Sequence, residues 1–283
     1  MVSTGTSPDW ASVEIAVPRS PRPLPGISMA GFHQRVPGPV DIAMVAHPAV
    51  TLLVDLSGGG CLAYRAGGRR EHGSVVIGLA PGDLRASGSG VGECLQIRLE
   101  PVAAATVFGA SAELGGALVA LDQLWGRHAG QVEERLSAAT SWAERFTIAG
   151  KMLGRRWETR RPVDPEVAQV WRRTLASRGR ARVEALADEV GWSRKRLWSR
   201  FRSQLGITPK GAARLVRFDH AAHLLVAGHD VARVAAESGY ADQSHLHRDV
   251  RAYAGTTPTA LAVAPWLAID DVAWPGSSPA LRP

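Results

Sequence analysis

Residues 187–192 read ADEVGW and residues 235–240 read AAESGY, while GITP at 206–209 matches GTTP at 255–258. The two copies are offset by 48 residues at the first glycine and by 49 at the second. A repeat at a nearly fixed period indicates one supersecondary unit that is built twice. The extra residue of the second copy is most simply placed in its turn.

Each copy has the pattern of a helix-turn-helix unit. The first helices are expected over residues 183–190 and 231–238. Gly191 or Gly239 follows, and glycine adopts the left-handed backbone conformation that a tight turn between helices needs. Ser193 and Asp242 can then cap a second helix by accepting hydrogen bonds from its free amides. The second helix of such a unit can lie in the major groove of DNA.

Helical phase separates the buried positions of the second helices from the exposed ones, because successive residues turn by about 100°. The inward stripes are Leu197, Phe201 and Leu205 in the first copy and Leu246, Val250 and Tyr253 in the second. On the exposed faces we expect base contacts from eight residues: Lys195, Trp198, Ser199, Arg202, Gln243, Ser244, His247 and Arg248. Two of these have a competing interpretation, since Trp198 can pack at the domain surface and His247 can simply be solvated.

Phosphate contacts are expected from five basic residues of the same region: Arg194, Arg196, Arg200, Lys210 and Arg214. Such contacts supply affinity, whereas base contacts supply sequence choice. Between the copies, residues 209–227 predict one long helix. It would hold the two reading helices in successive major grooves, about 10 bp apart.

The charge of the chain is concentrated in this region. The whole chain of 283 residues has a net charge of +7, and residues 178–253 hold 14 basic and 8 acidic residues, a net of +6. Residues 192–217 contain eight basic residues and no acidic one. A run of one sign indicates an anionic partner, and double-stranded DNA is the partner that fits the repeat.

The first part of the chain predicts a different architecture. Short β-favouring runs are expected at 13–17, 41–45, 51–56, 61–65, 74–79 and 93–99, separated by loops such as the glycine-rich 57–60 and 86–92. Amphipathic helices are expected at 114–125, 131–136 and 142–157. The predicted fold class is therefore α+β. Its three parts are an N-terminal domain at 1–160, β-rich to about residue 100, an all-α domain at 161–265 and a flexible tail at 266–283.

The repeat region resembles the paired helix-turn-helix domain of the AraC family of transcriptional regulators. The matching residues are 186–193, 200–202, 205–209, 235–240, 242–244, 248 and 255–258. The sequence departs from the family at Ser199, where arginine is usual, and at Leu246 and Val250, where phenylalanine is usual. The resemblance implies a variable N-terminal sensing or dimerising domain, and the β-rich part is loosely similar to the cupin-like sensing domains of this family.

Other classes of protein lack support in the sequence. Cys61 and Cys94 form no CxxC pair, His33, His47 and His72 stand alone rather than in a metal-binding pattern, and the motifs GxSxG, HExxH and the P-loop are missing. No apolar run is long enough for a membrane span. We therefore expect no metal, no cofactor, no catalytic residue and no membrane partner, and a cytoplasmic location.

The predicted function is sequence-specific regulation of transcription, with activation as the expected mode and no enzymatic activity. A small-molecule effector and RNA polymerase are candidate partners, and the chain is expected to be a monomer or a homodimer. Two alternatives stay open. A DNA-alkylation repair protein would need an activated cysteine in a Pro-Cys-His-Arg context, and a cupin-type sugar enzyme with an attached DNA-binding module would need turnover or metal in residues 1–160.

Overall fold

The strands of the N-terminal half form where apolar and polar residues alternate. In the strand Glu93–Leu99, the side chains of Leu95, Ile97 and Leu99 are fully buried and those between them are not. A period of two places one row of side chains on each face of a sheet. The computed structural model describes residues 12–19, 24–58, 62–79, 82, 84–90, 92–109, 118–159, 162–264 and 270–274.

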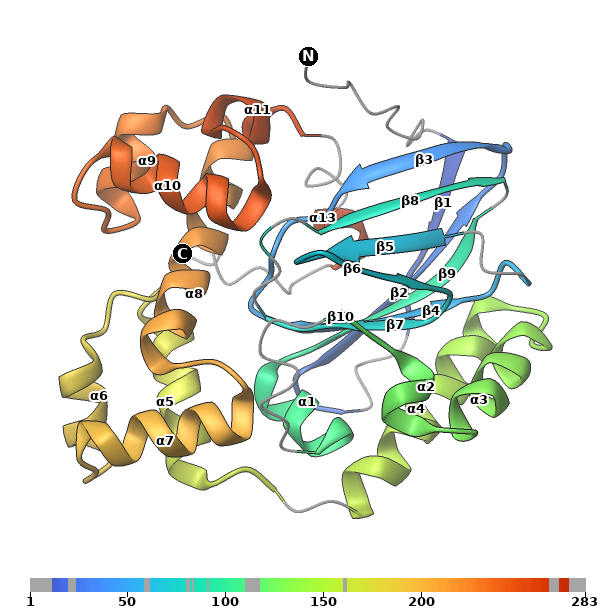
Figure 1. The fold of residues 1–283 in the computed structure, drawn as a ribbon, viewed down its shortest axis with the longest axis horizontal. Helices are drawn as coiled ribbons and strands as arrows, with labels where there is room; N and C mark the ends of the chain where they lie inside the picture. The colour runs from blue at the N-terminus through green and yellow to red at the C-terminus, as the bar shows by residue number, and fades with distance from the viewer. Residues whose placement is uncertain are drawn as a thin grey trace.

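Two antiparallel sheets make up this half (Figure 1). The first sheet has the order β1 (Val13–Ala16), β2 (Ile27–Gln34), β9 (Glu93–Leu99), β4 (Val50–Asp55), β7 (Val75–Ile77) and β10 (Leu118–Ala120). The second has the order β3 (Gly38–Ala43), β8 (Arg85–Gly90), β5 (Leu62–Ala66) and β6 (Arg69–His72). Four helices accompany the first sheet: α1 (Pro101–Phe108), α2 (Leu121–Trp125), α3 (His128–Ser137) and α4 (Trp142–Thr159).

The C-terminal half is helical. Its elements are α5 (Pro165–Ala176), α6 (Val183–Glu189), α7 (Arg194–Leu205), α8 (Pro209–Val226), α9 (Val231–Glu237), α10 (Gln243–Ala254) and α11 (Pro258–Ala262). Helix α8 is the long rod against which α5, α7, α9, α10 and α11 pack. A last helical turn, α13 (Asp270–Ala273), lies beside β1. Among the residues that the structure describes, every helix is too short or too polar to cross a bilayer.

The predicted fold class is confirmed, and several element predictions are corrected. Residues 86–92 were expected to be a loop, but Arg85–Gly90 is strand β8. Its small residues carry no strand signal of their own, and they are extended because β3 and β5 pair with the backbone on both sides. Residues 118–120 were expected in a helix and form edge strand β10; the helix begins at Leu121. Strand β2 and helix α5 were not predicted.

The tail also differs from the prediction. Trp274 is buried, and its indole lies 4.3 Å from the guanidinium carbon of Arg98. Ala273 and Trp274 cluster with Ala30 of the first sheet. Residues 270–274 are therefore packed against the N-terminal half rather than free in solution. The rest of the predicted tail, at 266–269 and 275–283, lies outside the described residues, as does Cys61.

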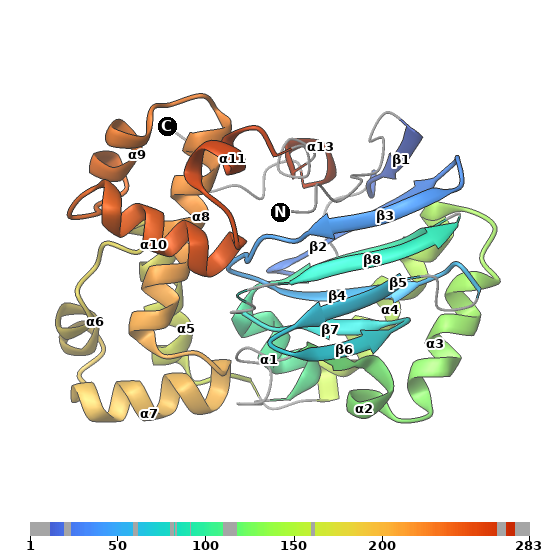
Figure 2. The ribbon, with the colours of Figure 1, turned by 45° about the horizontal axis from the view of Figure 1, so that its top comes forward.

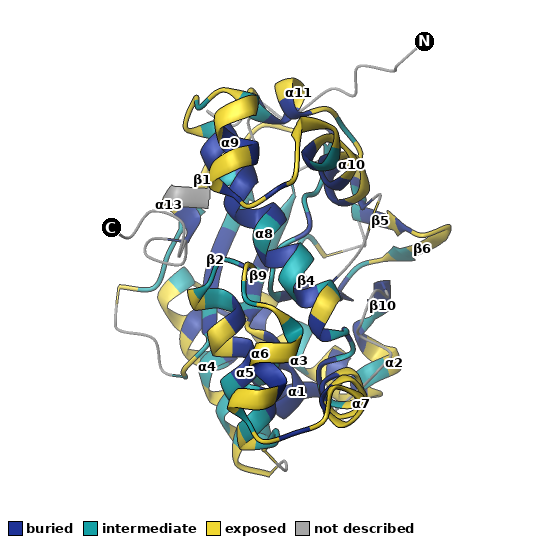
Figure 3. Cartoon of the chain, turned by 90° about the vertical axis from the view of Figure 1, so that its left-hand side faces the viewer, coloured by how far each residue is buried: buried dark blue, intermediate teal, exposed yellow. Residues whose placement is uncertain are grey.

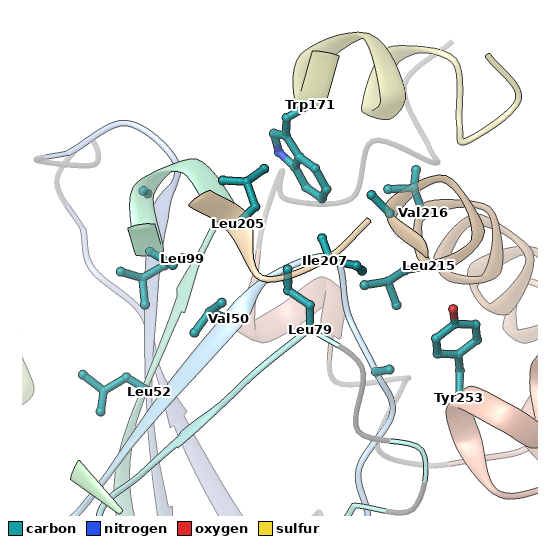
Figure 4. Close-up of a cluster of buried hydrophobic side chains, with 14 of the residues drawn as sticks. Val50, Leu52, Leu79, Leu99, Trp171, Leu205, Ile207, Leu215, Val216 and Tyr253 are labelled. Carbon is teal, nitrogen blue, oxygen red and sulfur yellow. The ribbon is translucent and has the colours of Figure 1, made fainter. Parts of the chain in front are cut away.

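One apolar cluster joins the two halves. Figure 4 shows Val50 and Leu79 of the β-rich half close to Leu205, Ile207 and Trp171 of the helical half. All five side chains are buried, and α1 also packs against α7. Burial of this apolar surface stabilises the arrangement by roughly 25 cal/mol for each Å² removed from water. The halves therefore share a core instead of meeting through polar surfaces alone (Figure 1).

Gly31 tests the contact between the first sheet and α4. A Cβ atom at Gly31 would overlap the indole ring of Trp142. We expect Gly31→Ala to lower the free energy of unfolding by about 1–3 kcal/mol, because the ring must move in a packed layer. Urea unfolding measures the change. Gly130→Ala on α3 is the matched control, since nothing lies within 4 Å of its added Cβ and alanine favours helix. Equal effects of the two substitutions would contradict the packing argument.

Candidate nucleic-acid interface

The two helix-turn-helix copies have the same local structure. Gly191 has φ 66° and Gly239 has φ 73°, so both turns use the left-handed conformation that glycine tolerates. The hydroxyl of Ser193 accepts a hydrogen bond from the amide of Arg196, and the carboxylate of Asp242 accepts one from the amide of His245. Both second helices, α7 and α10, then end on a left-handed glycine. The predicted caps and turns are confirmed.

The predicted inward stripes are buried. Leu197, Phe201 and Leu205 on α7 have the same role as Leu246, Val250 and Tyr253 on α10. All eight predicted base-reading residues are exposed, namely Lys195, Trp198, Ser199, Arg202, Gln243, Ser244, His247 and Arg248. Their roles toward DNA stay predictions. The structure shows only that no part of the described chain covers them.

Helices α7 and α10 lie on the same side of α8. Figure 1 places both in front of the long helix, and Figure 3, turned by 90°, places both at the right-hand side. Figure 2 shows them one above the other along α8. Two reading helices on one side of a rigid rod can enter neighbouring turns of one duplex. Lys195 and Arg202 on α7 and Arg248 on α10 are all exposed on these two helices.

Aromatic residues support part of this surface. The guanidinium of Arg202 lies 5.1 Å from the ring centre of Trp198, which is 47% exposed, and that of Arg196 lies 4.5 Å from the ring centre of Trp192. The ring of His245 meets Tyr240 edge-on at 5.1 Å. Cation–π contacts of this kind orient arginine side chains while leaving the charge exposed.

The predicted phosphate-binding residues differ in their surroundings. Lys210 is exposed, whereas Arg194 pairs with Glu184 at 3.2 Å and Arg200 pairs with Asp164 at 2.6 Å. These ion pairs are at the surface, where each is worth about 0–1 kcal/mol. A phosphate group can therefore replace the carboxylate at small cost.

Arg214 has a structural partner that the sequence did not reveal. Asp249 of α10 is buried, and its Oδ1 accepts a hydrogen bond from Nε of Arg214 at 2.7 Å and lies 2.7 Å from Nη2 of the same ion pair. Arg217 lies 3.8 Å from the other carboxylate oxygen. The linker helix thus holds the second reading helix by a charged contact in addition to its apolar packing. Only the fold brings residues 35 positions apart in sequence together.

A cavity of about 170 Å³ lies between the two sheets, and sequence reasoning missed it entirely. Its apolar lining includes Phe32, Met44, Leu53, Tyr64, Ile77 and Trp274. Its polar groups include Gln34, His47, Gln96 and Arg98. Lining residues come from both sheets and from the packed residue Trp274. No local pattern could have indicated them, because each strand contributes only one to three.

One wall of the cavity touches the helical half. His47 lines the cavity, and its Nδ1 lies 3.0 Å from the carboxylate of Asp219 on α8. The amide of the neighbouring Ala46 donates a hydrogen bond to the carbonyl of Tyr253 on α10, at 3.2 Å. His223, also on α8, has its ring centre 6.4 Å from that of His47. The segment after β3 is therefore shared by the cavity, the linker helix and the second reading helix.

Burial shifts the pKa values of several groups. Burial, reinforced by Asp55, raises the pKa of the Cys94 thiol to about 12, so the reactive thiolate is disfavoured. Burial lowers the pKa of His220 to about 4, with Arg178 adding to the shift, and the ring is neutral at pH 7. Burial also raises the pKa of Tyr240. Among the described residues, no three His, Cys, Asp or Glu side chains converge as a metal site would require.

The Arg214–Asp249 contact predicts a double effect for Arg214→Ala. Removing the guanidinium leaves a buried carboxylate without its closest donor, so we expect the free energy of unfolding to fall by about 1–3 kcal/mol. Affinity for operator and random DNA should fall together, because the residue would contact phosphate only. Urea unfolding and fluorescence anisotropy measure the two effects. Arg200→Ala, whose partner Asp164 is partly exposed, should change stability by no more than about 1 kcal/mol.

Comparison with known proteins agrees with this geometry. A family model described as a helix-turn-helix domain matches residues 186–262. A search of the curated proteins gives no match for the chain.

Three solved structures illustrate the partial similarity of this chain to known folds. ToxT from Vibrio cholerae O395 has 8% sequence identity over 84% of this chain and 97% of its own, with a TM-score of 0.47. The C-terminal domain of AraT, a response regulator from Geobacillus stearothermophilus, has 20% identity over 35% of this chain and 85% of its own, with a TM-score of 0.33. The AraC-like transcriptional activator CuxR has 15% identity over 68% and 80%, with a TM-score of 0.28. Residues 186–262, which contain both copies of the repeat, form a helix-turn-helix domain.

Proposed function

We propose that this chain regulates transcription by placing α7 and α10 in two successive major grooves of a promoter, under the control of a small effector bound between its two sheets. One observation carries the DNA-binding part of the proposal. Two units with matching caps and turns place their second helices on the same side of one long helix, and each of these helices carries exposed polar residues. Neither a structural hairpin pair nor an enzyme needs that arrangement.

Residues of the two reading helices are proposed to make two kinds of contact, to bases and to the sugar-phosphate backbone. Arg202 and Arg248 can donate two hydrogen bonds to one guanine, and Gln243 can pair in the same way with adenine. Lys195, Ser199 and Ser244 add contacts to bases or phosphates, and Trp198 can stack against the sugar-phosphate backbone. The basic residues Arg194, Arg196, Arg200, Lys210 and Arg214 supply the salt-dependent attraction to phosphate.

The cavity suggests the size and chemistry of the effector. A volume of about 170 Å³ is close to that of an apolar cavity that accepts a molecule the size of benzene. The lining is mainly apolar, and Arg98, Gln96 and Gln34 offer polar contacts at one wall. A small and mostly apolar molecule with one polar or anionic group fits these properties. A nucleotide would be too large.

Control of DNA binding would pass through the segment after β3. A ligand that favours one position of residues 44–47 would change the contacts of His47 with α8 and of Ala46 with α10. Binding can only shift a conformational equilibrium through such differential contacts. The position of the second reading helix is the property that an effector would alter. RNA polymerase and a second copy of the chain are further candidate partners, and an enzymatic role has no positive support among the described residues.

The base-reading assignment predicts a selective loss. We expect Arg248→Ala to weaken the binding free energy for the operator by about 1–3 kcal/mol. The preference for one particular base pair of the operator should also be relaxed. Random DNA should be affected far less, because the contact is to a base edge. Selection of binding sites from a random duplex library, followed by anisotropy measurements, checks both statements. An equal loss on operator and random DNA would refute the assigned role.

The contact between the segment after β3 and helix α8 predicts a change in the hydrogen exchange of that segment. We expect His47→Ala to release the segment after β3 from α8, so the amide of Ala46 should exchange with deuterium faster than in the wild type. Hydrogen exchange followed by mass spectrometry measures this, together with exchange near Tyr253. His72→Ala, at an exposed position of β6, is the control and should leave the exchange unchanged. Unchanged protection of Ala46 in the His47 variant would rule out this route.

A further inference from the structure

Three arginines form a row across the second sheet. Arg65 on β5 is paired in register with Arg85 on β8 on one side and with Arg70 on β6 on the other. Residues directly opposite one another in antiparallel strands project from the same face, with Cβ atoms about 4.5–5.5 Å apart. The neighbouring Tyr64 is buried inside the half, so the alternation places the arginines on the outer face.

The row is poorly neutralised. Like charges at directly opposite positions destabilise a sheet. Asp41 pairs with Arg85 at 2.6 Å, but no carboxylate of the described residues lies within ion-pair distance of Arg65 or Arg70, and both are exposed. Glu71, the acidic residue of β6, is paired in register with Tyr64 and so belongs to the other face. The fold itself gains nothing from this concentration of positive charge, which indicates an anionic partner.

The row adjoins the second reading helix. A Cβ atom at Gly82, three residues before Arg85, would lie 3.1 Å from the carbonyl oxygen of Ala252 on α10. Ala252 follows Arg248 by four residues, and positions i and i+4 share one face of a helix. Figure 3 shows the β5–β6 hairpin at the same side of the molecule as α7 and α10. The C-terminal end of α10 therefore lies next to Gly82, close to the start of β8 in the second sheet.

We propose that Arg65 and Arg70, with Arg85 beside them, are a second phosphate-binding surface that contacts the backbone of the same duplex that α7 and α10 read. This inference rests on the proposed function and extends it to the N-terminal half. The guanidinium group binds phosphate oxygens with two parallel hydrogen bonds, and the duplex offers phosphates at regular spacing. Proximity to the second reading helix favours DNA over any other polyanion. The sensing half thereby contributes affinity but no base preference.

Salt dependence tests the proposal in the full-length chain. Binding is measured by anisotropy between 50 and 200 mM salt on two fluorescent 30-bp duplexes, a selected operator and its scrambled sequence. For the double variant Arg65→Ala/Arg70→Ala we expect the slope of log affinity against log salt to be shallower by about 1.8, about 0.9 for each phosphate. The loss of affinity across this range should shrink by about tenfold. The preference for operator over scrambled DNA should stay the same.

Two matched double variants distinguish a direct phosphate contact of Arg65 and Arg70 from a general effect of the net charge of the chain. Arg65→Lys/Arg70→Lys keeps both charges and should keep most of the slope. Arg127→Ala/Arg135→Ala removes two exposed charges next to and on α3, which lies away from the helical half (Figure 1), and should leave the slope unchanged. Urea unfolding verifies that each variant folds, and the loss of like-charge repulsion should not lower the stability of the alanine pair.

The possible failures are distinguishable. A wild-type slope in the Arg65→Ala/Arg70→Ala variant, or an equal change in the Arg127→Ala/Arg135→Ala variant, would overturn the proposed contact while the chain still binds DNA. If the Arg65→Ala/Arg70→Ala variant binds DNA normally but no longer activates transcription with purified RNA polymerase, the surface binds the polymerase and the DNA assignment is wrong. If the wild-type chain binds neither duplex, the proposed function itself fails.

Discussion

Helix α8 sets the separation of the two reading helices, and the remaining functional geometry depends on how firmly it does so. Apolar side chains along the rod, among them Leu215, Val216 and Leu225, are buried against the helices on both sides. The contact of Arg214 with the buried Asp249 adds a directional constraint, because a guanidinium bonds a carboxylate in a fixed plane. Two helices can bind neighbouring major grooves of one duplex together only if the distance between them is fixed.

The helical half is not independent of the β-rich half. Leu205 and Ile207, at the end of the first reading helix and in the turn after it, are buried in the cluster that includes Val50 and Leu79. The second reading helix is tied to the segment after β3 through Tyr253. Each reader thus has its C-terminal end against the N-terminal half and its N-terminal end in solvent. This arrangement leaves the eight predicted base-contacting residues exposed and joins the C-terminal ends of both helices to the β-rich half.

The folded chain concentrates positive charge at a place that the charge count along the sequence does not indicate. Counted along the sequence, nearly all of the excess positive charge belongs to residues 178–253. The three arginines of the second sheet are unremarkable in that count, because acidic residues elsewhere in the N-terminal half balance them. Strand pairing aligns them on one outer face beside α10. The local field at a surface depends on which charges are neighbours in space, not on the net charge of a segment.

The sequence by itself determined the two helix-turn-helix units and the linker helix between them, but not helix α5. The glycine turns and capping residues act on their immediate neighbours in the chain, and their repetition can be read from the sequence. Helical phase then separates Leu197 and Phe201 from Arg202 without knowledge of the rest of the fold. Strand β8, the cavity, the Arg214–Asp249 contact and the arginine row depended on tertiary structure alone. Each joins segments far apart in the chain, and the pairing of a strand or the closing of a cavity is fixed by long-range packing that leaves no periodic signal in any one segment.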